Sequence, residues 1–157
     1  MIIYHGSYLE VESPDIVHSR PRVDFGRGFY ATPIREPAEN WCGKFLRQGK
    51  AGIVNQYEFS EEKLTEFQVL HFEKYSEEWL DFILNCRRGK DMSEFDFVSG
   101  GVANDKVFNT IELYFDGLIE KQEALKRLQY EQPNLQYCFR SQELIDQSLK
   151  FVGSEKI

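Results

Sequence analysis

Cysteine is scarce in this sequence of 157 residues, and the three that occur, Cys42, Cys86 and Cys138, are far apart. An odd number of cysteines with no C-x-x-C pair argues against a disulfide scaffold and against a zinc site. We therefore expect reduced thiols, as in a cytoplasmic protein, and no bound metal.

Long apolar runs are missing as well. No stretch reaches the ~20 apolar residues that a membrane-spanning helix needs. Tyr4, His5 and Ser7 interrupt the apolar start that a secretory signal would require. The sequence also has no internal repeat and no linker rich in glycine, proline or serine. We expect one domain over residues 1–157, not associated with a membrane, whose last few residues fray.

Several well-known cofactor and catalytic motifs do not occur. The sequence has no G-x-G-x-x-G, Walker A, H-E-x-x-H or G-x-S-x-G pattern. The isolated run Gly26-Arg27-Gly28 lacks the third glycine of a dinucleotide-binding fingerprint. A Rossmann-type site is therefore unsupported.

Aromatic residues, by contrast, are abundant and make up 15% of the chain. Their burial offsets the entropy lost on ordering, so most of the chain is expected to fold. The formal net charge of -7 disfavours a broad nucleic-acid footprint. Four arginines nevertheless fall close together in the chain, where they could form a local basic path or simply a solvated surface. They are Arg20, Arg22, Arg27 and Arg35.

The hydrophobic periodicity predicts strands and helices in a mixed order. The predicted strands cover residues 2–5, 26–32, 52–59, 67–72, 95–99, 135–139 and 150–152. The predicted helices cover residues 33–46, 77–87, 105–114, 119–128 and 142–147. Because this order does not alternate regularly, as a doubly wound sheet would require, it predicts an α+β fold.

The first of three unusual segments is Tyr4-His5-Gly6-Ser7. It places an imidazole at the end of a predicted strand, where the ring can bond a ribose hydroxyl. Gly6 has no Cβ, so a planar ligand can reach its backbone N–H and C=O groups. The alternative is that His5 is a structural hydrogen-bonding group, and the segment alone does not decide between the two.

The second segment is Asp24–Thr32, in which two glycines lie beside Phe29 and Tyr30. Glycines next to aromatic residues can form a floor that a flat ring approaches closely, and Tyr30 can stack on that ring. The alternative is a glycine bulge that leads into an ordinary core strand.

The third segment is Asn134–Phe139, where Gln136 interrupts a β-prone run. A polar residue at this place can project from a strand into a cleft. Simple alternation on a half-exposed strand is the alternative.

Taken together, the three segments resemble a known family. The order His-Gly-Ser, then Gly-x-Gly-aromatic-Tyr-x-Thr, then a late strand with a polar residue resembles the diphtheria-toxin and PARP branch of ADP-ribosyltransferases, named for a His–Tyr–Glu triad. Within that fold, the chain is most similar to the domain of unknown function 3990 family, and this similarity covers nearly the whole chain. The resemblance implies a split mixed β-sheet core with flanking helices and an NAD-binding cleft.

The resemblance also implies roles for individual residues. His5 would bond the 2′-hydroxyl of the nicotinamide ribose. The Gly6 backbone would hold the nicotinamide carboxamide, and Ser7 would assist at that amide or at a nearby hydroxyl. Tyr30 and Trp41 would enclose the nicotinamide ring between them.

Five further positions follow from the same resemblance. Gln136 would take the place of the family's glutamate, and Phe29 would contribute to the cofactor-binding surface. Arg20, Asn104 and Asp105 are candidate rim or substrate contacts. Capping of a helix by Asn104 or Asp105 is the alternative for those two residues.

The implied activity is mono-ADP-ribosyl transfer, with NAD+ as co-substrate, release of nicotinamide and an acceptor that is a protein, a nucleic acid or a small molecule. The likeness to small bacterial members adds the expectation of a toxin paired with a small antitoxin protein. Gln136 brings no full negative charge to the third triad position. Two alternatives therefore stay open: a module that binds NAD+ or ADP-ribose without turnover, and an interaction protein with a vestigial cleft.

Overall fold

The computed structural model describes residues 1–103, 105–131 and 134–157. Its strands are β1 (Ile2–Ser7), β2 (Phe29–Ala31), β3 (Ile53–Phe59), β4 (Val69–His71), β5 (Phe97–Gly101), β6 (Leu135–Phe139) and β7 (Leu149–Lys156). Its helices are α1 (Arg35–Arg47), α2 (Glu77–Arg87), α3 (Asp105–Phe115), α4 (Lys121–Leu128) and α5 (Gln142–Ser148), with a 3-10 helix η1 (Glu61–Glu66). This mixture confirms the predicted α+β class.

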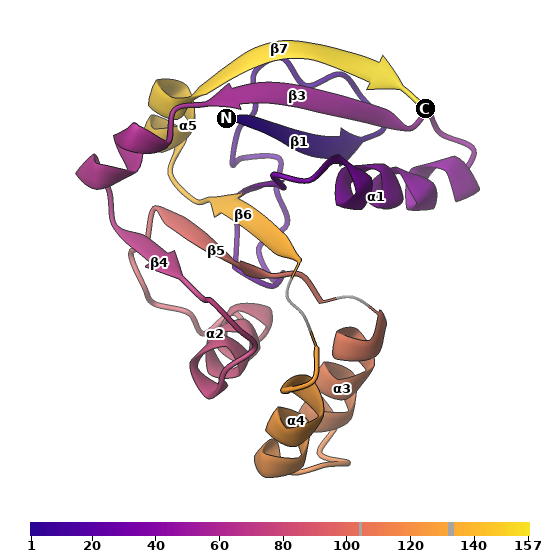
Figure 1. The fold of residues 1–157 in the computed structure, drawn as a ribbon, viewed down its shortest axis with the longest axis vertical. Coiled ribbons are helices and arrows are strands. Elements are labelled where there is room, and N and C mark those ends of the chain that lie inside the picture. The colour runs from indigo at the N-terminus through magenta and orange to yellow at the C-terminus, as the bar shows by residue number, and fades with distance from the viewer. Residues whose placement is uncertain (104, 132–133) are drawn as a thin grey trace.

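The strands form two sheets that lie one above the other in Figure 1. The upper sheet has the order β1-β3-β7 and is antiparallel. The lower sheet has the order β2-β6-β5-β4, in which β4 and β5 run parallel and the other neighbours antiparallel. One isolated bridge, between Tyr4 of β1 and Thr32 just after β2, joins the two sheets.

Aromatic rings fill the space between the two sheets. Tyr57 and Phe59 alternate with more polar residues along β3, so their rings point to the side of the lower sheet. There they pack edge to face with Phe29 and Phe139 at centroid distances of 5.5 and 5.1 Å. Such aromatic pairs add about 0.5–1.5 kcal/mol each beyond the area that they bury. Many of the aromatic residues of the sequence are therefore buried in this inter-sheet core.

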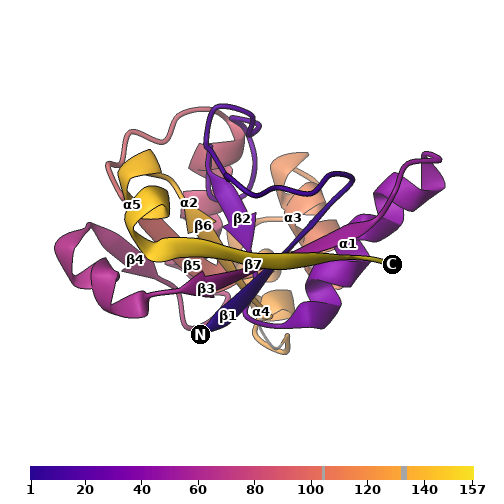
Figure 2. The same ribbon diagram turned by 90° about the horizontal axis from the view of Figure 1, so that it is seen from above.

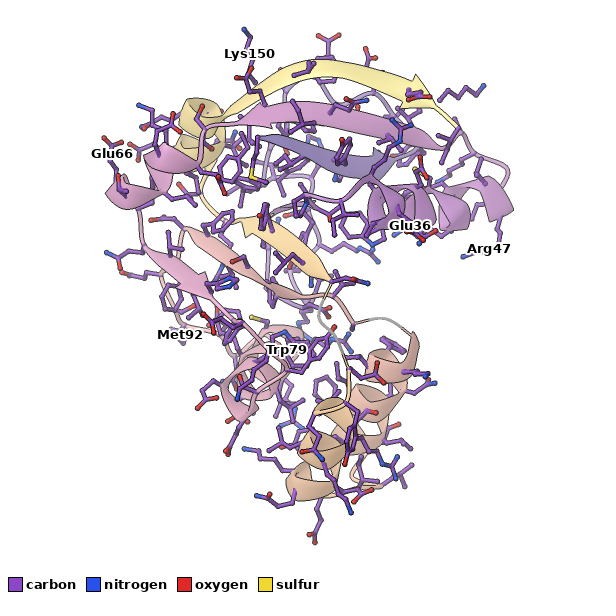
Figure 3. The ribbon with its side chains drawn as sticks, in the orientation of Figure 1. Glu36, Arg47, Glu66, Trp79, Met92 and Lys150 are labelled. Carbon is purple, nitrogen blue, oxygen red and sulfur yellow. The ribbon has the colours of Figure 1, made fainter. Side chains whose placement is uncertain are left out.

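Helices α2, α3 and α4 cover the other face of the lower sheet (Figures 1 and 2). Trp79 of α2 is fully buried there, and its side chain lies between α2 and the α3–α4 pair (Figure 3). Helix α2 begins where the sequence predicts, because the Ser76 hydroxyl accepts a hydrogen bond from the Trp79 N–H at 3.2 Å and so caps the first turn.

Helix α1 packs against β1 at one glycine. A Cβ atom on Gly6 would overlap the carbonyl oxygen of Ala38 and would also crowd the Cys42 sulfur. Because Gly6 has no side chain, α1 can approach β1 closely at this position.

Replacing Gly6 by alanine is expected to lower the free energy of unfolding by about 1–3 kcal/mol, because the backbone of α1 must move away from β1. Gly153→Ala is the matched control, since a Cβ at Gly153 meets no atom within 4 Å. Urea denaturation of the two variants measures the difference. Equal stabilities would contradict the close approach of α1.

The prediction for the end of the chain was wrong. The last residues do not fray, because β7 continues to Lys156, which pairs with Ile53 of β3, and the Ile157 N–H donates to the Gly52 carbonyl at 2.9 Å. Polar residues in this segment point to solvent while Leu149 and Phe151 face inward, so the apolar pattern ends before the strand does.

Two further observations concern the state of the cysteines and the search for membrane-spanning helices. Cys42, Cys86 and Cys138 are buried free thiols. Among the described residues, no helix combines the length and the apolar character needed to cross a membrane.

Candidate functional site

The site predicted from the sequence centres on the junction of the two sheets. Tyr4 of β1 and Thr32 exchange two backbone hydrogen bonds, of 2.8 and 2.9 Å. The Thr32 hydroxyl donates to the Leu135 carbonyl of β6 at 3.1 Å. Strands β1, β2 and β6, which carry His5, Tyr30 and Gln136, are therefore neighbours in space although β6 lies more than a hundred residues from β1.

His5 is held by the strand that carries Tyr30. Its Nδ1 lies 2.6 Å from the Tyr30 carbonyl oxygen. A carbonyl can only accept, so Nδ1 carries the proton and donates, and the neutral ring presents Nε2 as an acceptor. Burial, and to a smaller extent the charge of Lys44, lowers the pKa of His5 to about 4. At neutral pH this imidazole is therefore an uncharged acceptor for a hydroxyl donor.

The low pKa of His5 predicts a pH-dependent stability. Between pH 6.5 and about 4 the unfolded chain binds the imidazole proton and the folded chain does not, so the free energy of unfolding falls as pH is lowered through this window. Wild type is expected to lose about 2 kcal/mol between pH 7 and pH 5 relative to His5→Gln. Urea denaturation at both pH values measures this difference. Parallel losses in the two proteins would show that His5 is not buried as a neutral ring.

Gly6 is a buried residue on β1, which is an edge strand of the upper sheet. Tyr4 directs its N–H and C=O toward Thr32, and these groups alternate along a strand, so those of Gly6 point to the same side. Beyond Thr32 the chain leaves for α1, and no strand of the described residues covers that edge. The backbone groups of Gly6 are therefore not used in strand pairing among the described residues, and its absent side chain accommodates α1.

Phe29 and Ser7 support His5 rather than form an open surface. The Phe29 ring lies 4.5 Å from the His5 ring at an interplanar angle of 36°, and Phe29 is buried in the inter-sheet core. Ser7 is also buried, and its hydroxyl oxygen accepts from the Leu9 N–H at 3.3 Å. Both residues therefore lie next to His5, where they fix its ring and the start of the following loop.

Tyr30 folds the glycine segment back on itself. Its hydroxyl donates to the Gly26 carbonyl at 2.6 Å and accepts from the Phe25 N–H at 2.9 Å. Burial raises its pKa well above the ordinary value, so the phenol stays protonated. Gly26 adopts a positive φ of 79°, and a Cβ on Gly28 would overlap Cys138 and Phe139 of β6. The two glycines thus serve the turn and the packing of β2 on β6.

Gln136 lies on the same face of the lower sheet as Tyr30. Tyr30 pairs with Cys138 on β6. Side chains two positions apart on a strand lie on the same face, so Gln136 shares the face of Cys138 and Tyr30. Gln136 is 4% exposed, and its amide nitrogen donates one long hydrogen bond, of 3.5 Å, to the Gly101 carbonyl. Its amide oxygen accepts no hydrogen bond from the described residues. This oxygen is therefore a candidate acceptor beside the β2–β6 junction.

The remaining predicted residues lie farther from this junction. Trp41 is a half-buried residue of α1, one position before Cys42, whose thiol points to the Ser7 carbonyl at 3.8 Å. Arg20 is exposed in the loop after β1. Within the described part of the chain, no hydrogen bond, ion pair or ring contact joins Trp41 or Arg20 to His5. Asn104 and the side chain of Asp105 lie outside the described residues.

A comparison with known families shows to which family the chain belongs. A family model described as "Protein of unknown function (DUF3990)" matches residues 1–151. This chain belongs to the DUF3990 family. Neither a curated protein nor a solved structure matches it.

The described cavities of this DUF3990 member do not coincide with the predicted site. A cavity of about 610 Å³ lies at the opposite end of β6 and is lined by Arg22, Cys86 and Arg140, among others. A smaller one, of about 370 Å³, lies beside β4. We retain the strand junction as the candidate site, because it combines an oriented imidazole, an open strand edge and a buried amide. The NAD-binding cleft itself stays a prediction.

Sequence reasoning missed two contributors in this DUF3990 chain. Thr32 connects β1, β2 and β6 through its backbone and its hydroxyl, and its place at the end of the Asp24–Thr32 segment was the available signal. Lys44 places a positive charge near His5 from the following helix. No sequence pattern marked Lys44, because its position depends on how α1 packs on β1.

Proposed function

We propose that this protein transfers a single ADP-ribose unit from NAD+ to an acceptor and releases nicotinamide. The observation that carries the proposal is the junction of three strands that places His5 against the strand of Tyr30 and puts Tyr30 and Gln136 on one face of the same sheet. The family-type motif order in the sequence supports the same assignment.

The chemistry would begin with the bond between nicotinamide and ribose. His5 Nε2 would accept from a ribose hydroxyl, the Gly6 backbone would hold the carboxamide, and Tyr30 and Trp41 would enclose the ring. As the C–N bond breaks, its electron pair leaves with nicotinamide and positive charge develops on the ribose. The amide dipole of Gln136 would face that charge. The acceptor then attacks C1′ and loses its proton to solvent.

Nicotinamide release measures this activity directly. The purified protein is incubated with NAD+ and a cell extract, and free nicotinamide and labelled acceptors are quantified. Release that depends on the extract and on NAD+ is expected. No release together with no calorimetric NAD+ binding would contradict the proposal and would favour an interaction protein with a vestigial cleft.

A binding module without turnover is the second candidate, and the neutral Gln136 favours it. An amide can accept a hydrogen bond but brings no full charge to stabilise the ribosyl cation. Calorimetric binding of NAD+ or ADP-ribose without any nicotinamide release would select this function over the transferase.

A toxin role, with a small antitoxin protein as partner, is part of the transferase proposal. It is supported by resemblance to small single-domain bacterial members and by no individual residue. Expression of the wild type would then be lethal, and His5→Ala would relieve the lethality. Lethality that persists in His5→Ala would show that the toxicity does not depend on the proposed site.

A further inference from the structure

The loop after β1 and the last turns of α1 form a patch of basic residues around one exposed and one half-buried aromatic ring, those of Tyr8 and Phe45. The Tyr8 and Phe45 rings lie 5.3 Å apart at an interplanar angle of 55°. The Lys50 ammonium lies 4.7 Å from the Tyr8 ring, and the Lys44 ammonium lies 4.8 Å from the Phe45 ring. We call these four residues, together with Arg20, the basic–aromatic patch.

The charges of this patch are held but not neutralised. An aromatic ring attracts an ammonium group without cancelling its charge. Among the described residues, neither Lys44 nor Lys50 nor Arg20 forms an ion pair with a carboxylate. Burial and the nearby charge of Arg20 lower the pKa of Lys44, as expected for cations that gather without an anion. Over the described residues, the three cations of the patch therefore lack a carboxylate in ion-pair contact.

One more cation extends the patch, because Arg47 lies at the outer end of α1 (Figure 3). Of the arginine cluster predicted from the sequence, Arg20 belongs to the patch, whereas Arg22 and Arg27 line the cavity at the opposite end of β6. Arg35 pairs with Glu39 and Glu155 at 2.7 and 2.6 Å.

Of the four carboxylates in the same loop, Glu10 accepts from the Ser154 hydroxyl, Glu12 is exposed, and the other two form ion pairs elsewhere. Asp15 accepts from His18 at 2.9 Å, and Asp24 accepts from Arg87 at 2.7 Å. The whole chain carries a net charge of -7, so its remaining surface repels a polyanion and leaves this face as the favourable approach.

We infer that the basic–aromatic patch binds single-stranded nucleic acid, and that nucleic acid is the acceptor class of the proposed transferase, on which this second part rests. Open surfaces that alternate cations with exposed aromatic rings suit a strand, because phosphates meet the cations while bases stack on the rings. Tyr8 is 42% exposed and available for such stacking.

The dinucleotide itself fits the patch less well. Small-molecule sites are concave and bury most of their ligand, whereas Tyr8 and Leu46 are 42% and 46% exposed. The row of cations also exceeds the two phosphates that NAD+ carries. The charge of Lys44 still reaches His5, so the patch adjoins the candidate site. In the transfer step, a base nitrogen of the strand would attack C1′ and lose its proton to solvent as nicotinamide leaves.

Fluorescence anisotropy with labelled single strands of about 12 nucleotides, one of RNA and one of DNA, tests the inference. The wild type is expected to bind at least one of them, with an affinity that falls as salt rises. Lys44→Gln/Lys50→Gln should weaken binding roughly tenfold or more and reduce the salt slope by about 1.4. Lys74→Gln/Lys126→Gln is the control with the same charge change, and it should bind like the wild type.

NAD+ calorimetry on the same proteins separates this inference from the proposed function. Lys50→Gln alone, which leaves the charge of Lys44 beside His5 in place, should weaken strand binding and keep the NAD+ affinity of the wild type, as a distinct surface for the strand requires. A parallel loss of NAD+ affinity, equal losses in the control, or no strand binding by the wild type would overturn the inference. Strand binding without any NAD+ binding by the wild type would support the surface, but would overturn its role as an acceptor site and the transferase function with it.

Discussion

His5→Ala is expected to reduce nicotinamide release by about a hundredfold or more and to weaken NAD+ binding by about tenfold. The neutral ring is oriented by its bond to the Tyr30 carbonyl, so Nε2 is fixed as the acceptor for the ribose. Loss of one oriented polar contact to a reacting group typically costs 10²–10³ in rate, about 3–4 kcal/mol. Calorimetry with NAD+ and a nicotinamide assay measure the two effects.

The control for this substitution is His71→Ala. His71 lies on β4, the strand of the lower sheet farthest from β2, and bonds Ser99 at 2.6 Å. It should retain both NAD+ binding and turnover. Thermal denaturation of both variants shows whether a loss of activity reflects unfolding. His5→Ala with wild-type binding and turnover would remove His5 from the site.

Gln136→Glu is expected to raise nicotinamide release by about tenfold or more. A carboxylate at this buried position would face the developing ribosyl cation with a full charge, where the amide offers only a dipole. Burial also raises the pKa of the introduced carboxyl group, so the gain should grow as pH increases. A nicotinamide assay between pH 6 and pH 9 records both the gain and its pH profile.

Gln56→Glu on β3 is the control, because it makes the same chemical change on a strand of the other sheet. It should leave the release rate unchanged. If Gln136→Glu folds and binds NAD+ but releases nicotinamide no faster than wild type at any pH, then position 136 does not face the ribose. A site without Gln136 would then have to supply the charge stabilisation.

Local sequence signals predicted most of the elements of this fold. The alternation along β3 and the periodicity of α2, with Ser76 at its cap, depend on neighbouring residues and could be read directly. The end of β7 could not, because Lys156 is ordered by pairing with Ile53 rather than by its own apolar character. The 3-10 helix η1 also lacked a periodic signal of sufficient length.

For the candidate site, the sequence indicated residue types but not their roles. Gly6 was chosen for its open backbone, and the structure adds that its missing side chain also admits α1. Tyr30 was chosen for its ring, while its hydroxyl is used to close the Gly26 turn. Such double roles depend on contacts between distant segments, which neither composition nor spacing records.

The composition of the basic–aromatic patch also depends on contacts between distant segments. The sequence grouped Arg35 with the other arginines by proximity along the chain, but Arg35 pairs with Glu155, which is 120 residues away. Conversely, Lys50 lies over the Tyr8 ring only because α1 packs beside the end of β1. The partners of a charge are therefore set by the fold.

A crystal structure with NAD+ or a non-hydrolysable nicotinamide analogue tests the central claim most directly. We expect the ribose hydroxyl within hydrogen-bond distance of His5 Nε2, the carboxamide on the Gly6 backbone, and the Gln136 amide facing the ribose. A dinucleotide bound elsewhere, for instance in the cavity beside Arg140, with the His5 and Gln136 side chains uncontacted, would contradict the assignment.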